Sequence, residues 1–448
     1  MPWPLDTLSW IEFNSCCGFG SHSWDSRGTR RLWRVPYVAQ EVFHHTFDNG
    51  LTLLAERMEH VRSAALNFLV PGGCAFDPPE YLGVASVLSD LITRGAGKRD
   101  SRELTLALDN LGLDRDESVG SIHMRFWGAT LASNLPAALE IYADILRRPR
   151  LPAEEIDAVK ALAFQDLQGL EDEPRQKLLI ELRRRHYPEP LGHDRRGTRE
   201  GIEKIKPRVM RQHYERHFGP RGTILSVAGN VAWEQLLEQV GRLFGDWQGS
   251  AEPTLRLGPQ PPPLEHLEKD TTQTQIGIAY PSVPISHADY YNAQGAVNVL
   301  SGGMSSRLFT EVREKRGLCY AVWASYQTFK DRASVVCYAG TTNERAQETL
   351  DVTLNELRRL QDGIEPDEVE RVKAGLKSSL IMQQESTSAR AGSLASDWYY
   401  LGRVRSFDEI QAAVDSLAPD TIVGHLRRFP PKDFTIVTLG PKKLKVPA

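Results

Sequence analysis

Apolar residues recur at helical spacing within residues 81–95 and predict a buried amphipathic helix. They are Val84, Val87, Leu88 and Leu91. Ser86, Ser89 and Asp90 stand at positions i, i+3 and i+4, so they share one polar face of this helix. Taken alone, these three residues indicate an ordinary polar helix face.

The same patterns divide the rest of the chain into strands and helices. Short apolar or alternating runs predict strands at residues 42–47, 51–56, 62–70, 121–131, 222–228, 274–280, 319–328, 333–340 and 434–439. Helical periodicity predicts helices at residues 101–111, 135–148, 152–170, 207–217, 233–244, 290–300, 305–314, 344–361 and 366–384. Asn49-Gly50 predicts a tight hairpin turn, and Ser101 is the expected N-cap of its helix.

A proline-rich stretch separates two similar halves. Residues 248–265 contain five prolines and predict a stiff linker between domains at residues 42–247 and 266–448. Three segments of the first half match the second in order. They are residues 87–89 with 299–301 (299 − 87 = 212), 138–148 with 349–359 (349 − 138 = 211) and 155–161 with 368–374 (368 − 155 = 213). The near-constant offset predicts an α+β fold of two homologous domains, each a mainly antiparallel sheet with helices on one face.

The N-terminal segment, residues 1–41, differs in composition from the rest. Residues 1–34 contain Cys16-Cys17, four tryptophans and four arginines, without the basic and apolar regions of a secretory signal. We expect a poorly ordered extension, or translation from a start upstream of the natural one. A membrane- or partner-binding arm is the weaker alternative.

Composition narrows the class of protein. The 448 residues carry a net charge of −4, which gives no general case for nucleic acid binding. No apolar run approaches the roughly 18 residues of a membrane-spanning helix. Five cysteines without metal spacing argue against a disulfide framework and mildly favour a reducing compartment, so a cytoplasmic location is expected.

Several short motifs, in order along residues 42–440, carry a family resemblance. They are residues 48–51 (DNGL), 71–73 (PGG), 83–85 (GVA), 171–174 (EDEP), 226–231 (SVAGNV), 305–309 (SSRLF) and 312–320 (VREKRGLCY). Together with the duplication, they make the chain resemble the inverted-zincin peptidases, namely pitrilysin, insulysin and the mitochondrial processing peptidase with its bacterial relatives. The resemblance implies that the two domains form half of a peptidase clamshell.

The family's metal motif, H-x-x-E-H on a helix, binds Zn²⁺ through its two histidines and uses the glutamate as general base. Aligned on residues 83–85, the two histidine positions are Ser86 and Asp90, and the glutamate position is Ser89. The family's later carboxylate ligand falls at Asp166, 76 residues after Asp90 (166 − 90 = 76).

These residues lack the chemistry of the motif. A neutral serine hydroxyl is a poor Zn²⁺ ligand, and Ser89 has no basicity near neutral pH. Asp90 and Asp166 alone supply few of the oxygen ligands that Ca²⁺ requires, and whether they bind any cation stays open. We therefore expect no metal in this chain, and the resemblance places Zn²⁺ in a partner subunit.

A second family feature is intact. In the family, an arginine and a tyrosine seven residues apart act on the zinc site from the C-terminal domain, and here they are Arg313 and Tyr320. The resemblance implies that the phenol donates to the oxyanion of the tetrahedral intermediate and that the arginine positions the substrate backbone. Without that context, the two residues would indicate only a helix-end charge and a half-buried strand aromatic.

Two hypotheses follow from the resemblance. The first is a non-zinc-binding subunit of a heterodimeric metallopeptidase, inactive alone, that acts on peptides or unfolded segments with a homologous zinc-bearing partner. The alternative is a non-catalytic structural or peptide-binding protein, as in respiratory-complex core subunits of this fold. Weaker candidates are a metal role for His186, His193 and Asp194, where a surface loop is favoured, and a Cys319 nucleophile, which lacks a nearby histidine in sequence.

Overall fold

The computed structural model describes residues 40–249 and 251–446, so the predicted N-terminal extension lies almost wholly outside the described residues. The N-terminal half is built on a six-stranded sheet in the order β1-β2-β8-β3-β7-β6. Its strands are β1 (Glu41–Thr46), β2 (Thr52–Arg57), β3 (Ser63–Pro71), β6 (Asp114–Val119), β7 (His123–Leu131) and β8 (Ile224–Gly229). Neighbouring strands are antiparallel, except that β2 and β8 are parallel.

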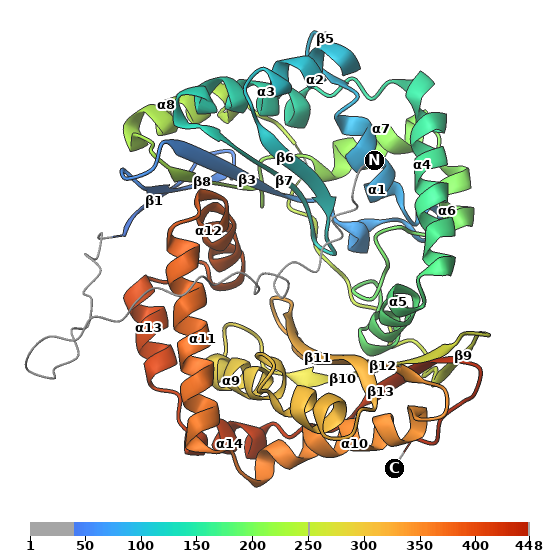
Figure 1. Ribbon diagram of the computed structural model, residues 1–448. Coiled ribbons are helices and arrows are strands. Elements are labelled where there is room, and N and C mark those ends of the chain that lie inside the picture. The colour runs from blue at the N-terminus through green and yellow to red at the C-terminus, as the bar shows by residue number, and fades with distance from the viewer. Residues whose placement is uncertain (1–39, 250, 447–448) are drawn as a thin grey trace, which may run out of the picture. The chain divides into compact units, whose positions relative to one another are not determined.

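Helices of the same half pack on this sheet and fill its core (Figure 1). They are α1 (Val84–Ile92), α2 (Ser101–Asp109), α3 (Leu135–Arg147), α4 (Ile156–Gly169), α6 (Arg199–Lys204), α7 (Pro207–His217) and α8 (Trp233–Phe244). A two-stranded hairpin, β4 (Gly95–Ala96) and β5 (Arg99–Asp100), joins α1 to α2. The Asn-Gly turn between β1 and β2 is confirmed, with Gly50 at a φ of +94°.

The C-terminal half is built on a five-stranded sheet in the order β11-β12-β10-β13-β9. Its strands are β9 (His266–Glu268), β10 (Gln273–Ser282), β11 (Cys319–Thr328), β12 (Ala333–Thr342) and β13 (Thr435–Gly440). The helices of this half are α9 (Tyr290–Ser301), α10 (Ala346–Arg359), α11 (Pro366–Gln384), α13 (Phe407–Asp415) and α14 (Pro419–Arg428). Between Trp247 and Glu265, the described residues form neither helix nor strand.

The strand orders of the two sheets reveal the duplication. Read from β6 and from β11, the sheets run β6-β7-β3-β8-β2 and β11-β12-β10-β13-β9, and each contains one parallel pair, β8 with β2 and β13 with β9. Only β1 has no counterpart. The predicted α+β fold of two homologous domains is therefore confirmed.

The second face of each sheet is covered by one helix that comes from the other half of the same chain (Figure 1). From the N-terminal half, α5 (Pro174–His186) places Leu178 and Leu182 against Ala279 and Val437 of the second sheet. From the C-terminal half, α12 (Thr387–Leu401) lies on β3 and β8 of the first. These equivalent helices are thus exchanged between the halves, which binds residues 40–446 into one packed unit.

Local details differ from the sequence predictions in three respects. Ser101 is not the N-cap of α2, because Asp100 accepts a hydrogen bond from the Glu103 amide at 2.8 Å while the Glu103 carboxylate accepts from the Asp100 amide at 3.0 Å. Residues 309–314 form a π-helical turn where an ordinary helix is predicted. Strands β4, β5, β6 and β9 and helices α5, α6, α12, α13 and α14 are additional to the predicted elements.

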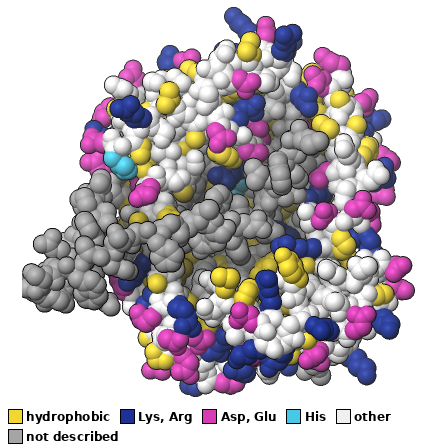
Figure 2. All heavy atoms as spheres, in the orientation of Figure 1, with side chains coloured by type: hydrophobic (Ala, Val, Ile, Leu, Met, Phe, Trp, Pro, Cys, Tyr) yellow, Lys and Arg dark blue, Asp and Glu magenta, His cyan; other side chains and the backbone are white. Residues whose placement is uncertain are grey.

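Acidic and basic side chains are intermingled on the face shown in Figure 2, as the small net charge suggests. Within residues 40–249 and 251–446, no helix is both long and apolar enough to cross a membrane.

Candidate functional site

The structure brings the four residues expected at the motif positions together at one cavity of about 270 Å³ in the N-terminal half. Ser86, Ser89 and Asp90 enter it from α1, and Asp166 enters from α4. The remaining wall is formed by residues 117–119 of the edge strand β6, by Leu162 and Ala163 of α4, and by Arg195 and Arg196 of the loop before α6. Ser86, Ser89 and Asp90, which helical spacing places on one face of α1, therefore do line one surface in the structure.

A buried carboxylate orients α1. Asp77 accepts hydrogen bonds from the backbone amides of Gly83, at 2.7 Å, and Ala85, at 3.1 Å, which satisfies free donors at the helix N-terminus. Burial raises the pKa of Asp77 to about 7, against the effect of these hydrogen bonds. Gly83, at a φ of +101°, allows the chain to turn into the helix, and an added Cβ would lie 2.8 Å from the Arg196 carbonyl oxygen.

The polar residues of α1 differ in their surroundings. The Ser86 hydroxyl donates a 2.7 Å hydrogen bond to the carbonyl of Arg195, and Ser89 is buried. Desolvation raises the pKa of Asp90, and nearby Asp166 adds to the shift while Arg94 opposes it. Burial likewise raises the pKa of Glu117, which lies across the cavity on β6. Carboxyl groups therefore crowd this cavity from three elements.

Arg196 compensates part of this negative charge. Its Nε lies 3.0 Å from Oδ2 of Asp166, and its Nη1 lies 3.5 Å from Oδ1 of Asp194. Its Nη2 donates a hydrogen bond to the side chain of Gln176 at 3.1 Å. Neither Arg195 nor Arg196 was singled out by the sequence, because their approach to α1 depends on a loop conformation that no periodicity encodes.

The donor atoms of the cavity do not suit Zn²⁺. The H-x-x-E-H motif occurs nowhere in the 448-residue sequence. Across the described part of the chain, no three or more His, Cys, Asp or Glu residues are arranged to hold a metal ion. The residues that line the cavity include no histidine, the Ser86 hydroxyl is bonded to a backbone carbonyl, and the Asp166 carboxylate is paired with a guanidinium, so the lining lacks the imidazole ligands of a zinc site.

The loop predicted as a weaker metal candidate is mainly structural. His186, at the end of α5, contacts the hydroxyls of Ser334, at 2.7 Å, and Thr435, at 3.0 Å, on the second sheet. Asp194 pairs with Arg196. His193 contributes its backbone carbonyl to a 3.7 Å contact with the thiol of Cys74.

Arg313 and Tyr320 lie outside the cavity lining and pair with each other in the C-terminal half. The guanidinium carbon of Arg313 is 5.1 Å from the centroid of the Tyr320 ring and 4.7 Å from that of Phe309. Phe309 and Arg313 share the π-helical turn, whose wider spiral brings residues i and i+4 closer to alignment. Phe309 belongs to the motif at residues 305–309, but nothing in the sequence indicates its contact with Arg313.

Tyr320 projects into solvent from the start of β11. The pairing of β11 with β12 shifts register between Cys319 and Ala321, so Tyr320 occupies a β-bulge. Its side chain is 81 % exposed, which is unusual for a large aromatic residue. Burial raises the pKa of the neighbouring Cys319 thiol to about 11, which disfavours a nucleophilic thiolate.

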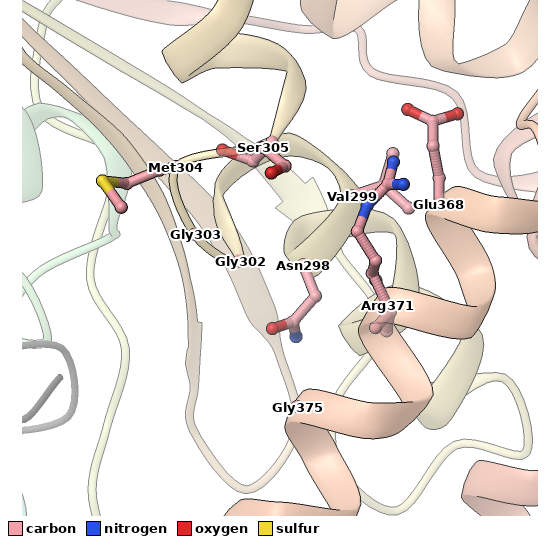
Figure 3. A pocket seen from close by; sticks show the side chains of 11 residues that line it. Asn298, Val299, Gly302, Gly303, Met304, Ser305, Glu368, Arg371 and Gly375 are labelled. Atoms are coloured by element: carbon pink, nitrogen blue, oxygen red, sulfur yellow. The ribbon is translucent and has the colours of Figure 1, made fainter. Parts of the chain in front are cut away.

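A second cavity, of about 170 Å³, occupies the duplicated position in the C-terminal half (Figure 3). An offset of 212 residues places Asn298 at the equivalent of Ser86 (86 + 212 = 298) and Gly302 at that of Asp90 (90 + 212 = 302), and both line this cavity. Its opposite wall is α11, the equivalent of α4, with Glu368, Arg371 and Gly375. The paired cavities therefore come from the duplication of the fold.

The two sheets define a two-domain α+β fold with a duplicated architecture, and comparison with known proteins assigns this fold to a peptidase family. The family model described as insulinase (peptidase family M16) matches residues 52–199, and that described as peptidase M16 inactive domain matches residues 204–376. The chain belongs to peptidase family M16.

Relatives and solved structures cover nearly the whole chain. An uncharacterized zinc protease of Bacillus subtilis is 26 % identical over 89 % of this chain and 98 % of its own length. One of Streptomyces coelicolor is 25 % identical over 93 % of each. The crystal structure of a peptidase M16 inactive domain from Pseudomonas fluorescens superposes with a TM-score of 0.82 at 18 % identity, covering 91 % of this chain and 99 % of that one. A protease from Helicobacter pylori gives 0.82 at 19 % identity, covering 90 % and 100 %. The likeness of the two solved structures concerns the fold.

Proposed function

We propose that this chain is the non-zinc-binding subunit of a heterodimeric metallopeptidase of the processing-peptidase type. A homologous subunit with an intact H-x-x-E-H motif holds the zinc ion and performs the hydrolysis. This chain contributes substrate binding and, through Arg313 and Tyr320, stabilisation of the oxyanion formed at the partner's metal.

The observation that carries the proposal is the exposure of Tyr320. A phenol that serves another chain's active site must protrude from its own chain, and 81 % of this side chain is exposed on a β-bulge. The guanidinium of Arg313 stacks on its ring and limits its rotation. A preorganised donor of this kind is worth about 2.7–4 kcal/mol of activation free energy, or a rate factor of about 10²–10³.

The cavity supports the same division of labour. Its serine hydroxyls and paired carboxylate cannot replace two imidazoles and a general base, so catalysis by this chain alone is not expected. Strand β6 forms one wall of the cavity, and among the described strands it pairs only with β7. An extended peptide can therefore add to the free edge of β6 and run past the cavity, which is a common mode of peptide binding.

The test combines this chain with a homologous subunit that has an intact H-x-x-E-H motif. Alone, the chain should bind no stoichiometric zinc and cleave no peptide, and the mixture should cleave an unfolded reporter substrate. Tyr320→Phe should lower kcat of the mixture by about 10²–10³-fold, because the ring remains beneath Arg313 while its donor is lost. Assembly, measured by analytical ultracentrifugation, should be unchanged.

Arg316→Ala is the matched control, because Arg316 lies near Arg313 but pairs with Glu311. Zinc-dependent cleavage by this chain alone would overturn the proposal. Full activity of a mixture carrying both Arg313→Ala and Tyr320→Phe would instead favour the alternative, a non-catalytic structural or peptide-binding subunit.

A further inference from the structure

We propose that Arg196 supplies, inside the cavity of the N-terminal half, the positive charge that a metal ion supplies in zinc-bearing relatives. The guanidinium and its loop hold the cavity walls together and exclude cations from the space between α1 and α4. This inference concerns the internal architecture of this chain and stands whether or not a catalytic partner exists.

The guanidinium of Arg196 links three separate segments. It pairs with Asp166 of α4 at 3.0 Å and with Asp194 of its own loop at 3.5 Å, and it donates to Gln176 of α5 at 3.1 Å. Only 10 % of its side chain is exposed, although it carries a permanent charge. Asp166, which occupies the position of the family's carboxylate ligand, is therefore already paired with a guanidinium, although 57 % of its side chain is exposed.

The loop that carries Arg196 is fixed against α1 by its backbone. The Ser86 hydroxyl, at the position of the family's first histidine, donates to the Arg195 carbonyl at 2.7 Å. The amide of Thr198 donates to the Leu82 carbonyl at 3.3 Å. Gly197 has a φ of +71°, and an added Cβ would lie 2.2 Å from the Gly83 nitrogen, so only glycine permits this close approach.

Two positions that bind metal in zinc-bearing relatives thus bind consecutive residues of one loop. Ser86 holds Arg195 and Asp166 holds Arg196. A divalent cation entering this space would meet the positive charge of the Arg196 guanidinium. Repulsion between the metal ion and this guanidinium, in a partly desolvated cavity, disfavours metal binding. This effect adds to that of lacking the two histidine ligands.

The experiment asks whether Arg196 itself opposes metal binding. A variant carrying Ser86→His, Ser89→Glu, Asp90→His and Asp166→Glu restores the family's ligand set, and is compared with the same variant carrying Arg196→Ala as well. Zn²⁺ affinity is measured by competition with a chromophoric chelator. Removal of Arg196 should tighten Zn²⁺ binding about 10–100-fold, the range found for residues surrounding metal ligands. Equal affinities would overturn the inference.

Single variants test the same point without a rebuilt site. Arg196→Ala removes the guanidinium that pairs with Asp166 and Asp194, so its midpoint of thermal unfolding should fall and then rise when Zn²⁺ or Mn²⁺ is added. The wild type and Arg199→Ala should not respond, because Arg199 stacks on Phe164 and is not part of the cavity lining. A metal response of the wild type as large as that of Arg196→Ala, or none in either, would overturn the inference. It would leave the proposed role of Tyr320 untouched.

Discussion

Arg390 and Glu56, 334 residues apart in the chain, form a buried ion pair between the two halves of the protein. Nη2 of Arg390 donates to Oε2 of Glu56 at 2.6 Å, and Nε donates to the same oxygen at 2.9 Å. Neither side chain is more than 5 % exposed. The pair joins α12 to β2 and fixes how the exchanged helix lies on the first sheet.

Arg390→Leu should destabilise the protein by about 3–5 kcal/mol, because it leaves the Glu56 carboxylate buried without its partner. Urea unfolding followed by circular dichroism measures the change. The control is Arg371→Leu, which removes an exposed, solvent-screened pair with Asp367 and should change the stability far less. Equal effects of the two substitutions would contradict a structural role for the buried pair.

Phe309→Leu should loosen the pairing of Arg313 with Tyr320, since it removes one of the two rings that contact the guanidinium. A cation–π contact at a partly exposed site is worth about 0.5–1 kcal/mol, so kcat of the reconstituted heterodimer should fall about two- to fivefold. Phe309→Tyr retains the ring and should restore the rate. A uniform loss in both variants would mean that Phe309 only supports the fold.

The buried histidines of α7 should make the protein sensitive to acid. Burial, with nearby Arg216, lowers the pKa of His213 to about 3 and that of His217 to about 4, from the ordinary 6.5. As the pH falls below 6.5, the unfolded chain takes up protons before the folded one, so stability declines between pH 6.5 and about 4. Each histidine contributes about 2 kcal/mol to the loss at about pH 5.

His213→Phe should therefore lose about 2 kcal/mol less than the wild type between about pH 7.5 and about pH 5. Urea titrations at the two pH values measure each loss, and exposed His45→Gln serves as the control. A wild-type loss that His213→Phe leaves unchanged would show that other groups dominate the acid response.

Asp77→Ala should destabilise the helix that carries Ser86, Ser89 and Asp90. It removes the acceptor for two backbone amides at the start of α1, at a cost of about 1–2 kcal/mol. Asp77→Asn keeps a carbonyl acceptor and should cost less. Thermal unfolding ranks the two variants, and an Asp77→Ala protein as stable as the wild type would rule out this role for Asp77.

Sequence patterns predicted the helices and strands in which the local conformational preference of the residues agrees with their burial in the fold. The helix around residues 84–92 follows from apolar periodicity, and the position of its polar face at the same cavity as Asp166 follows from the family spacing. Strand β6 escaped prediction because Asp114-Arg-Asp-Glu-Ser-Val119 is an edge strand rich in charge, as edge strands often are. Helix α5 was not predicted because its buried residues, Leu178 and Leu182, pack on the sheet of the other half, which local sequence patterns do not indicate.

The helix cap and the loop contacts could not be predicted from the sequence, for a different reason. Asp100 and Ser101 are both good N-cap residues, and only the backbone conformation decides between them. Arg196 resembles any loop arginine until the turn at Gly197 brings it beside Asp166. The sequence shows that an H-x-x-E-H motif is absent, but it does not show which residue lies beside Asp166.

The exchange of α5 and α12 also determines what happens if the chain is divided. A cut within residues 248–265 leaves each fragment holding the helix that covers the other fragment's sheet, so neither fragment carries a complete set of layers. The two pieces should remain associated after cleavage and should regain the native fold only when mixed. The linker is thus a covalent tether between mutually dependent fragments, and the smallest autonomous folding unit is the pair.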